Sequence, residues 1–214
     1  TSGSQAYTVE MWVKTSPKNA YTILFNQYGF GALFEFRTVF FIDTAANGGK
    51  LVFFKGSYVS LAGTTNLLDN QWHHVAMVRE NLGTVSLYVD GVVEATGLDT
   101  YPYSNTNSLL GGQTLLPDNY YNGFMDEVRI WNTARTQTEI ISSYDKILSG
   151  SESGLVAYYD FEDGTGSSIL SDGSGNSNNG TLINMDPNTD WVSADAPITN
   201  VSLTNDFNGT ADAS

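Results

Sequence analysis

The chain has 214 residues, of which 41% are hydrophobic and 13% aromatic, and its 23 acidic and 9 basic side chains give a net charge of −14. So many large apolar residues exclude a fully disordered chain, and the negative charge disfavours nucleic acid as a partner. The absence of cysteine excludes disulfides, thiolate catalysis and cysteine-ligated zinc. No run of the roughly 18 apolar residues that a spanning helix needs occurs, so we expect no membrane insertion.

Short segments of alternating apolar and polar residues dominate the chain, beginning with Tyr7–Lys14. Such alternation predicts half-buried strands, and pairs such as Asp90-Gly91 predict the turns between them. We expect further strands at residues 22–28, 32–36, 39–43, 50–54, 74–79 and 84–89, and later at 154–161 and 180–183. Because strands recur without intervening helices, the sequence predicts an all-β fold, a two-sheet antiparallel jelly-roll sandwich.

One short helix is expected near residues 136–148. Thr136 and Glu139 have the spacing of a capping box, in which each side chain binds a backbone amide at the start of a helix. Apolar residues follow at helical spacing: Ile140, Ile141, Tyr144, Ile147 and Leu148. We expect this apolar face to pack against the end of the sandwich.

Six segments in a fixed order carry a resemblance to a known family. They are Tyr7–Lys14, Gln71–Ala76, Leu87–Gly91, Tyr121–Asn132, Gly154–Phe161 and Asp172–Thr181. Together they resemble the laminin-G-like jelly-roll domains of the concanavalin A-like lectin/glucanase superfamily, which occur in bacterial surface and secreted multi-domain proteins. The resemblance implies a binding domain with this sandwich fold.

The order of the segments departs from that family, whose members begin with the strand that resembles Gly154–Phe161 and its loop. That segment either closes this sandwich, as in a circular permutation, or opens a following module. We favour closure, because a strand with an apolar face is not expected to remain in water. We therefore expect one domain over residues 1–196, with 151–196 supplying closing strands, and a linker or tail over 197–214.

The loop that begins at Asp172 is a candidate calcium site. Oxygen-bearing side chains alternate at Asp172, Ser174, Asn176 and Asn178, and calcium takes six to eight oxygen ligands. The alternative is a turn held by its own Asx side chains. The family resemblance implies a structural calcium near such a loop, with further ligands from Asp126 and Asp160.

The sequence contains only weak matches to the residue patterns of metal sites and of catalytic sites. Adjacent strand residues such as His73 and His74 point to opposite faces, so they do not form a metal pair; we expect one of them to be buried and hydrogen-bonded. Glycoside hydrolysis needs two carboxylates that face one another across a cleft, whereas Asp126 and Glu127 are neighbours on a strand. We therefore expect no enzymatic activity.

Aromatic residues in loops are the better indication of a ligand. Rigid, amphipathic tyrosine rings stack on sugars, and neighbouring Asn and Asp side chains bind hydroxyl groups. The candidate ligand-binding residues are Tyr101, Tyr103, Asp118, Asn119, Tyr120 and Tyr121. The alternative is that these rings pack against neighbouring loops.

Two functions remain open. The first is a non-catalytic, calcium-supported module that binds a polysaccharide or a cell-surface glycan. The second is an adhesive or spacer repeat that contacts protein or neighbouring modules of the same protein and has no sugar site. The chain starts at Thr1 without an initiator methionine or signal-peptide core, so for either function we expect a piece of a secreted or cell-surface protein.

Overall fold

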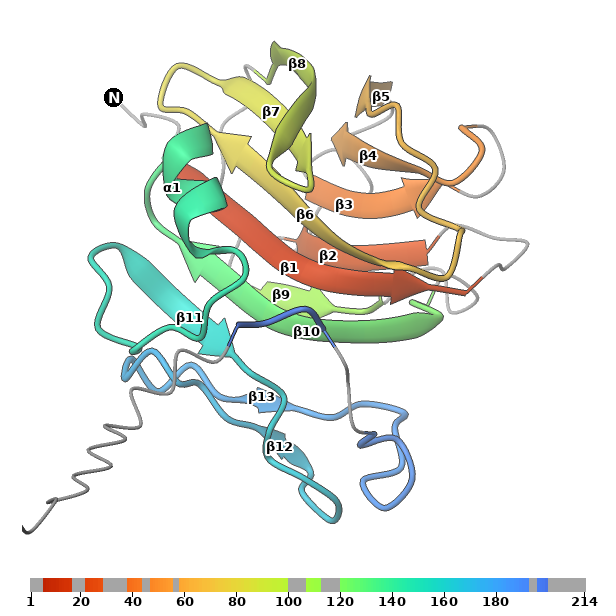
Figure 1. The fold of residues 1–214 in the computed structure, drawn as a ribbon, viewed down its shortest axis with the longest axis vertical. Helices are drawn as coiled ribbons and strands as arrows, with labels where there is room; N and C mark the ends of the chain where they lie inside the picture. Colours follow the sequence, from red (N-terminus) through yellow and green to blue (C-terminus); the bar gives the residue numbers. More distant parts are fainter. Residues whose placement is uncertain are drawn as a thin grey trace, which may run out of the picture.

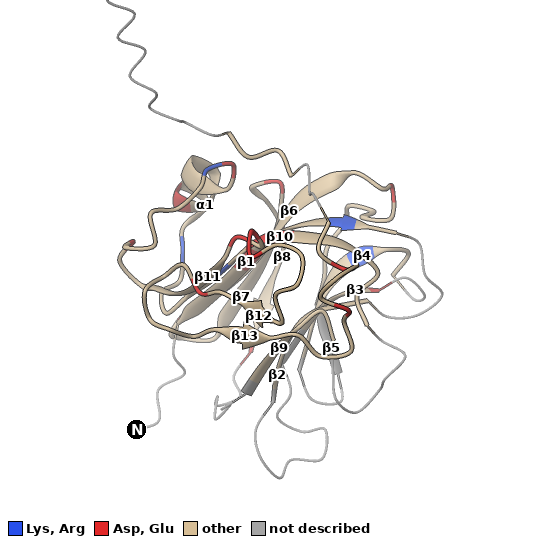
Figure 2. Ribbon diagram, turned by 90° about the horizontal axis from the view of Figure 1, so that it is seen from below, with Lys and Arg blue, Asp and Glu red and all other residues tan. Residues whose placement is uncertain are grey.

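The computed structural model describes residues 6–16, 22–28, 38–43, 47–55, 58–99, 107–112, 120–192 and 196–199. These residues form two large antiparallel sheets that pack face to face, a separate two-stranded sheet, and one short helix on the outside (Figure 1). Figure 2 shows the same layers turned by 90°. The arrangement is consistent with the expected jelly-roll sandwich.

The larger sheet has six strands in the order β11-β10-β1-β6-β7-β8. Their bounds are β1 (Tyr7–Thr15), β6 (Trp72–Arg79), β7 (Thr84–Val89), β8 (Val92–Leu98), β10 (Gly123–Trp131) and β11 (Leu155–Tyr159). The predicted alternation is best seen in β7, where every second side chain is buried. Edge strand β8 was not predicted, because its exposed positions leave no alternating pattern.

The smaller sheet has five strands in the order β5-β4-β3-β2-β9. They are β2 (Thr22–Tyr28), β3 (Thr38–Asp43), β4 (Lys50–Lys55), β5 (Tyr58–Ala62) and β9 (Asn107–Leu110). The predicted strands at 22–28, 39–43 and 50–54 are confirmed, β5 and β9 were missed, and the predicted strand at 32–36 lies outside the described residues. The short strands β12 (Ile169–Leu170) and β13 (Gly180–Thr181) pair with one another, so the strand expected at 180–183 is shorter than predicted.

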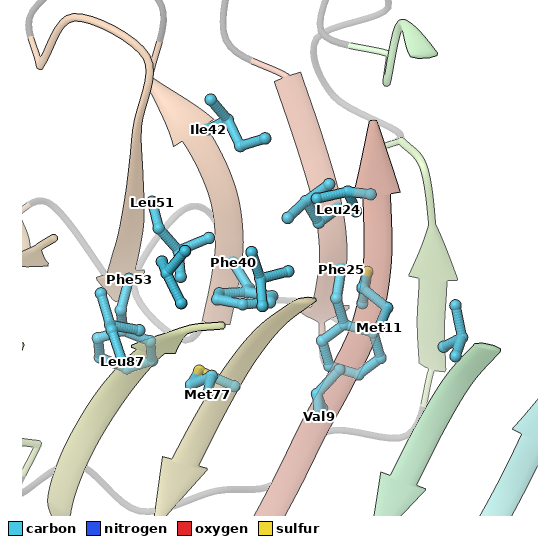
Figure 3. Close-up of a cluster of buried hydrophobic side chains, with 14 of the residues drawn as sticks. Val9, Met11, Leu24, Phe25, Phe40, Ile42, Leu51, Phe53, Met77 and Leu87 are labelled. Carbon is cyan, nitrogen blue, oxygen red and sulfur yellow. The ribbon is translucent and has the colours of Figure 1, made fainter. Parts of the chain in front are cut away.

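The core lies between the two sheets (Figure 3). Val9 and Met11 of β1 point into it, as do Leu24 and Phe25 of β2 and Phe40 of β3, and all five side chains are fully buried. Each such side chain contributes about 1.5–3 kcal/mol through burial. The core therefore fixes which face of β1 points outward: the face of Thr8, Glu10, Trp12 and Lys14.

The helix α1 (Gln137–Ser143) begins with the predicted capping box. The Thr136 side chain accepts a hydrogen bond from the Glu139 backbone amide, and the Glu139 side chain accepts one from the Thr136 backbone amide. It is shorter than expected, and Ile140 is its one buried residue, whereas Ile141 and Ile147 are 48% and 56% exposed. The helix also lies over the outer face of the six-stranded sheet and not at the end of the sandwich (Figure 1). Its position is set by polar contacts that the apolar pattern does not reveal.

The segment after Gly150 packs against the earlier strands. β11 pairs with β10 in antiparallel register, with Tyr159 opposite Val128 and Tyr158 opposite Arg129. Ala157, Tyr159 and Leu170 are buried in the main core, and Phe161 and Trp191 pack against it. This segment therefore supplies an edge strand and part of the core.

Candidate functional site

The carboxylate of Asp172 organises the loop that follows it. One oxygen accepts hydrogen bonds from the backbone amides of Tyr158 and Ser174, at 3.0 and 2.9 Å. The other oxygen accepts from the Ser174 hydroxyl and from the backbone amide of Asn178, both at 2.9 Å. Burial alone would raise the pKa of Asp172, but these hydrogen bonds stabilise the charged form and lower it.

The loop side chains bind the outer edge of β11. The side-chain amide of Asn178 donates to the Val156 carbonyl at 2.9 Å, and the Ser174 hydroxyl oxygen lies 3.0 Å from the same carbonyl. The Asn176 amide donates to the carbonyls of Leu155 and Val156, both at 3.1 Å. β11 is the last strand of its sheet, so these bonds satisfy backbone groups that a further strand would otherwise pair.

This arrangement does not fit calcium bound by the alternating loop residues. Both oxygens of Asp172 already accept two hydrogen bonds each, and Asn176 and Asn178 present N–H donors to β11. Over the described ranges, no group of three or more His, Cys, Asp or Glu is placed to hold a metal ion. The alternative interpretation, a turn held by its own side chains, accounts for the observed contacts.

Asp126, in β10, and Asp160, which directly follows β11, are the other two predicted ligands, and their charges interact. A bulge in β10, with Glu127 at a φ of 51°, keeps Asp126 on the outer face opposite Trp12. Burial raises the pKa of Asp126 to about 7, and the negative charges of Glu127, Glu162 and Asp160 also favour its protonated form. Among the described residues, no hydrogen bond joins this pair to the Asp172 loop.

A buried polar network under α1 was not predicted from the sequence. Glu10 is fully buried and accepts hydrogen bonds from the Trp131 indole, at 2.9 Å, and from Arg135. Arg129, also buried, binds Glu127 at 2.6 Å and the Ser143 carbonyl at the end of the helix at 2.8 Å. These charged pairs tie the helix to the sheet, and since each ion has a partner the cost of burying it is offset.

The two histidines have different environments. His74 is buried as expected, between Trp12 and Tyr144, yet neither ring nitrogen has a hydrogen-bond partner among the described residues. The expectation of a hydrogen-bonded buried histidine is therefore wrong for His74. The hydrogen-bonded ring is that of the partly exposed His73, 2.8 Å from Asp90 and 3.3 Å from Asp69, and these carboxylates raise its pKa.

Tyr120 and Tyr121 also have different environments, one exposed and one largely buried. The Tyr121 hydroxyl donates to the Phe124 carbonyl at 2.8 Å, the ring packs against the main core, and burial raises its pKa. Tyr120 is 39% exposed, and its hydroxyl lies 3.4 Å from the Asn184 amide. The remaining predicted ligand-binding residues, Tyr101, Tyr103, Asp118 and Asn119, lie outside the described residues.

The sequence pattern does not reveal a second group of at least partly exposed aromatic residues. Lys14 is paired with Phe124 of β10 on one side and with Trp72 of β6 on the other. The two rings are 6.4 Å apart, inclined at 50°, and the Lys14 ammonium lies 5.9 Å from the centre of the Phe124 ring. We refer to Phe124, Lys14 and Trp72 as the aromatic row. Its members are distant in sequence, and only the strand register brings them together.

Comparison with known proteins agrees with this fold. The family model Laminin G 3, described as the concanavalin A-like lectin/glucanases superfamily, matches residues 1–141. The chain belongs to this superfamily. No match was found among curated protein sequences. This concanavalin A-like chain has no helix, within the described residues, that is long and apolar enough to cross a membrane.

Solved structures share the fold at low sequence identity. A candidate carbohydrate binding protein from Bacteroides ovatus has a TM-score of 0.67 and 21% identity over 83% of this chain and 51% of its own, so the chain spans about half of that protein. Domain 4 of the extracellular arabinanase AbnA from Geobacillus stearothermophilus, in complex with arabinotriose, has a TM-score of 0.51 and 24% identity over 65% and 66%. The CBM40 domain of the Ruminococcus gnavus IT-sialidase, bound to α2,3-sialyllactose, has 0.54 and 16% over 66% and 83%.

These three structures are each less than 25% identical to the chain, and they show a shared fold.

Proposed function

We propose that this concanavalin A-like chain is a non-catalytic carbohydrate-binding module of a secreted or cell-surface protein. The observation that carries the proposal is the Tyr120 ring, which is 39% exposed and lies where β9 ends and β10 begins. We refer to this end of the sandwich as the rim. Three structural neighbours with sugar-related names support it at the level of the fold.

Local packing holds the Tyr120 ring in place. A Cβ atom added at Gly112 would come within 2.9 Å of the ring, so only glycine lets the ring lie this close to the backbone. At its other end the hydroxyl lies 3.4 Å from the Asn184 amide, a group able to bind sugar hydroxyls as well. A ring that is already positioned loses little conformational freedom when a sugar stacks on it.

The other predicted residues enter this proposal in different roles. Tyr121 packs against the core and so stabilises the chain next to Tyr120. Asp118 and Asn119 stay predicted neighbours of the sugar. Calcium is not part of the proposal, because the loop residues 172–178 do not fit it.

Affinity electrophoresis through gels that contain soluble polysaccharides tests the proposal. We expect at least one neutral polysaccharide to retard the chain, and Tyr120→Ala to weaken that retardation by about three- to tenfold, the effect of one aromatic contact. Leu82→Ala is the matched control, since Leu82 is 89% exposed between β6 and β7, at the end of the sheet opposite the start of β10. Absence of retardation by every polysaccharide would favour the adhesive or spacer module instead.

A further inference from the structure

We refer to residues 133–144, which contain α1, as the α1 region. This region covers only part of the outer face of the six-stranded sheet. Thr8 donates to the Thr133 carbonyl at 2.8 Å, Glu10 binds Arg135, and the Trp12 indole donates to the Tyr144 carbonyl at 2.6 Å. Lys14, the next outward residue of β1, has no such contact with the described part of this region. Figure 1 shows α1 over the part of the outer face where β1 begins, away from the end of β1 that carries Lys14.

The aromatic row lies at this end of the sheet. Phe124 is 37% exposed, and Trp72 and Lys14 are partly exposed. The two rings lean together beside the Lys14 stem, which gives an apolar surface with a cationic donor at its side. Aromatic rings next to a hydrogen-bond donor are suited to the apolar faces and hydroxyl groups of a sugar.

The row is rigidly connected to the rim that carries Tyr120. The Tyr121 hydroxyl donates to the Phe124 carbonyl at 2.8 Å, and β10 starts at Gly123. Four residues of extended chain span at most about 14 Å, so the Tyr120 and Phe124 backbones lie within that distance. A chain of a few sugar units is therefore long enough to contact both aromatic surfaces.

The charge of the molecule restricts the class of ligand. The net charge is −14, and Figure 2 shows acidic residues at many places on the described ribbon and basic residues at few. Asp126 lies two residues after Phe124 on the same face of β10. This field repels a polyanion, so Lys14 is better suited to donate to sugar hydroxyls than to attract a charged chain.

We propose that the aromatic row is a second sugar-binding subsite, so that the module binds an extended stretch of a neutral polysaccharide and not only a terminal sugar. This inference deepens the proposed function and rests on it. The Tyr120 rim holds one part of the chain, and the rings of Phe124 and Trp72 hold sugar units further along it.

The test compares chain lengths. The probes are arabinan, β-glucan, xyloglucan and galactomannan, with polygalacturonate as the anionic polymer, followed by short and long oligosaccharides of whichever neutral polymer retards the protein. We expect Phe124→Ala and Trp72→Ala each to weaken binding of the long chains by about three- to tenfold. Binding of the shortest fragments, which occupy the Tyr120 rim alone, stays unchanged.

The outcomes separate the inference from the proposed function. If Phe124→Ala binds long chains as the wild type does while Tyr120→Ala does not, the inference is overturned and the proposed function survives. Retardation by none of the polymers overturns both, and retardation by polygalacturonate alone overturns the neutral ligand class. Leu82→Ala is again the control, and thermal unfolding verifies that each variant is folded; Phe124, the more exposed ring, decides the test if Trp72→Ala does not fold.

Discussion

The carboxylate of Asp172 accepts a 3.0 Å hydrogen bond from the backbone amide of Tyr158, which joins the Asn- and Ser-rich loop to edge strand β11. Three further hydrogen bonds to the same carboxylate come from within the loop. Asp172 is therefore a structural residue, and its contribution can be measured as stability.

We expect Asp172→Ala to lower the free energy of unfolding by about 1–3 kcal/mol at pH 7, because three partly buried hydrogen bonds and one exposed one lose their charged acceptor. The stabilisation is present above about pH 4, the usual carboxylate range, and is lost as the pH falls through the lowered native pKa. Denaturant unfolding measures the difference, with the exposed Glu80→Ala as control. The loss should be equal with calcium and with chelator; a loss seen only with calcium would restore the metal interpretation.

We propose that residues 1–196 form a single sandwich, with 151–196 closing it. A chain that ends at Gly150 lacks β11 and the core side chains of Ala157, Tyr159 and Leu170. We expect it to lose cooperative thermal unfolding and to bind a hydrophobic dye, because the core is left open. A chain that ends at Thr199 is the control and should unfold like the full chain. Equal cooperativity of the Gly150 chain would place this segment in a following module.

The sequence was informative where the signal is local. The alternating pattern of β7 and the capping box at Thr136 each depend on a few neighbouring residues, and both are present. The loop at Asp172 was located correctly, but its side chains bind β11, and which partner they choose depends on the strand beside them.

Features that depend on strand register could not be predicted. Lys14, Phe124 and Trp72 meet only because β1 lies between β10 and β6. The same holds for Glu10 and Arg135, whose pairing requires the helix to cross the outer face of the sheet. A single sequence gives the faces of each strand, but not which strands are neighbours.

The buried Glu10 depends on Arg135, whose guanidinium also stacks 4.2 Å above the Trp131 ring. Burial raises the pKa of Glu10, and Arg135 opposes that shift. We expect Arg135→Met to destabilise the fold by about 3–5 kcal/mol at neutral pH, because a buried charge loses its partner. In the double variant with Glu10→Gln part of the loss should return, which a double-mutant cycle measures. Additive effects of the two substitutions would contradict this coupling.

The buried His74 is expected to make the stability of the fold depend on pH. Its buried ring is neutral, because burial and the charges of Arg129 and Arg135 hold its pKa well below the usual value. The unfolded chain takes up a proton near pH 6.5 and the folded chain does not, so the wild type loses stability as the pH falls below that value. We expect His74→Phe to keep the ring contacts with Trp12 and Tyr144, to be about as stable at pH 8, and to lose about 1–2 kcal/mol less than the wild type between pH 7 and pH 5. Parallel pH profiles for the two proteins would show that His74 is charged in the fold.

Asp126 has the reverse dependence on pH, since its pKa is raised to about 7 in the fold. Below about pH 4 the carboxyl is protonated in both states and costs nothing, whereas between about pH 4 and pH 7 the unfolded chain releases the proton first and stability falls. Asp126→Asn keeps the oxygen that accepts from the Glu127 amide at 2.8 Å and removes the charge. We therefore expect this variant to be more stable than the wild type by about 1–2 kcal/mol at pH 8, allowing for partial solvation, and equally stable at pH 4. Asp160→Asn, a substitution just after β11, should lower the apparent pKa of Asp126 in a carboxyl titration by NMR, because one repelling charge is removed. A destabilised Asp126→Asn at pH 8 would mean that the charged carboxylate has a favourable partner in solution.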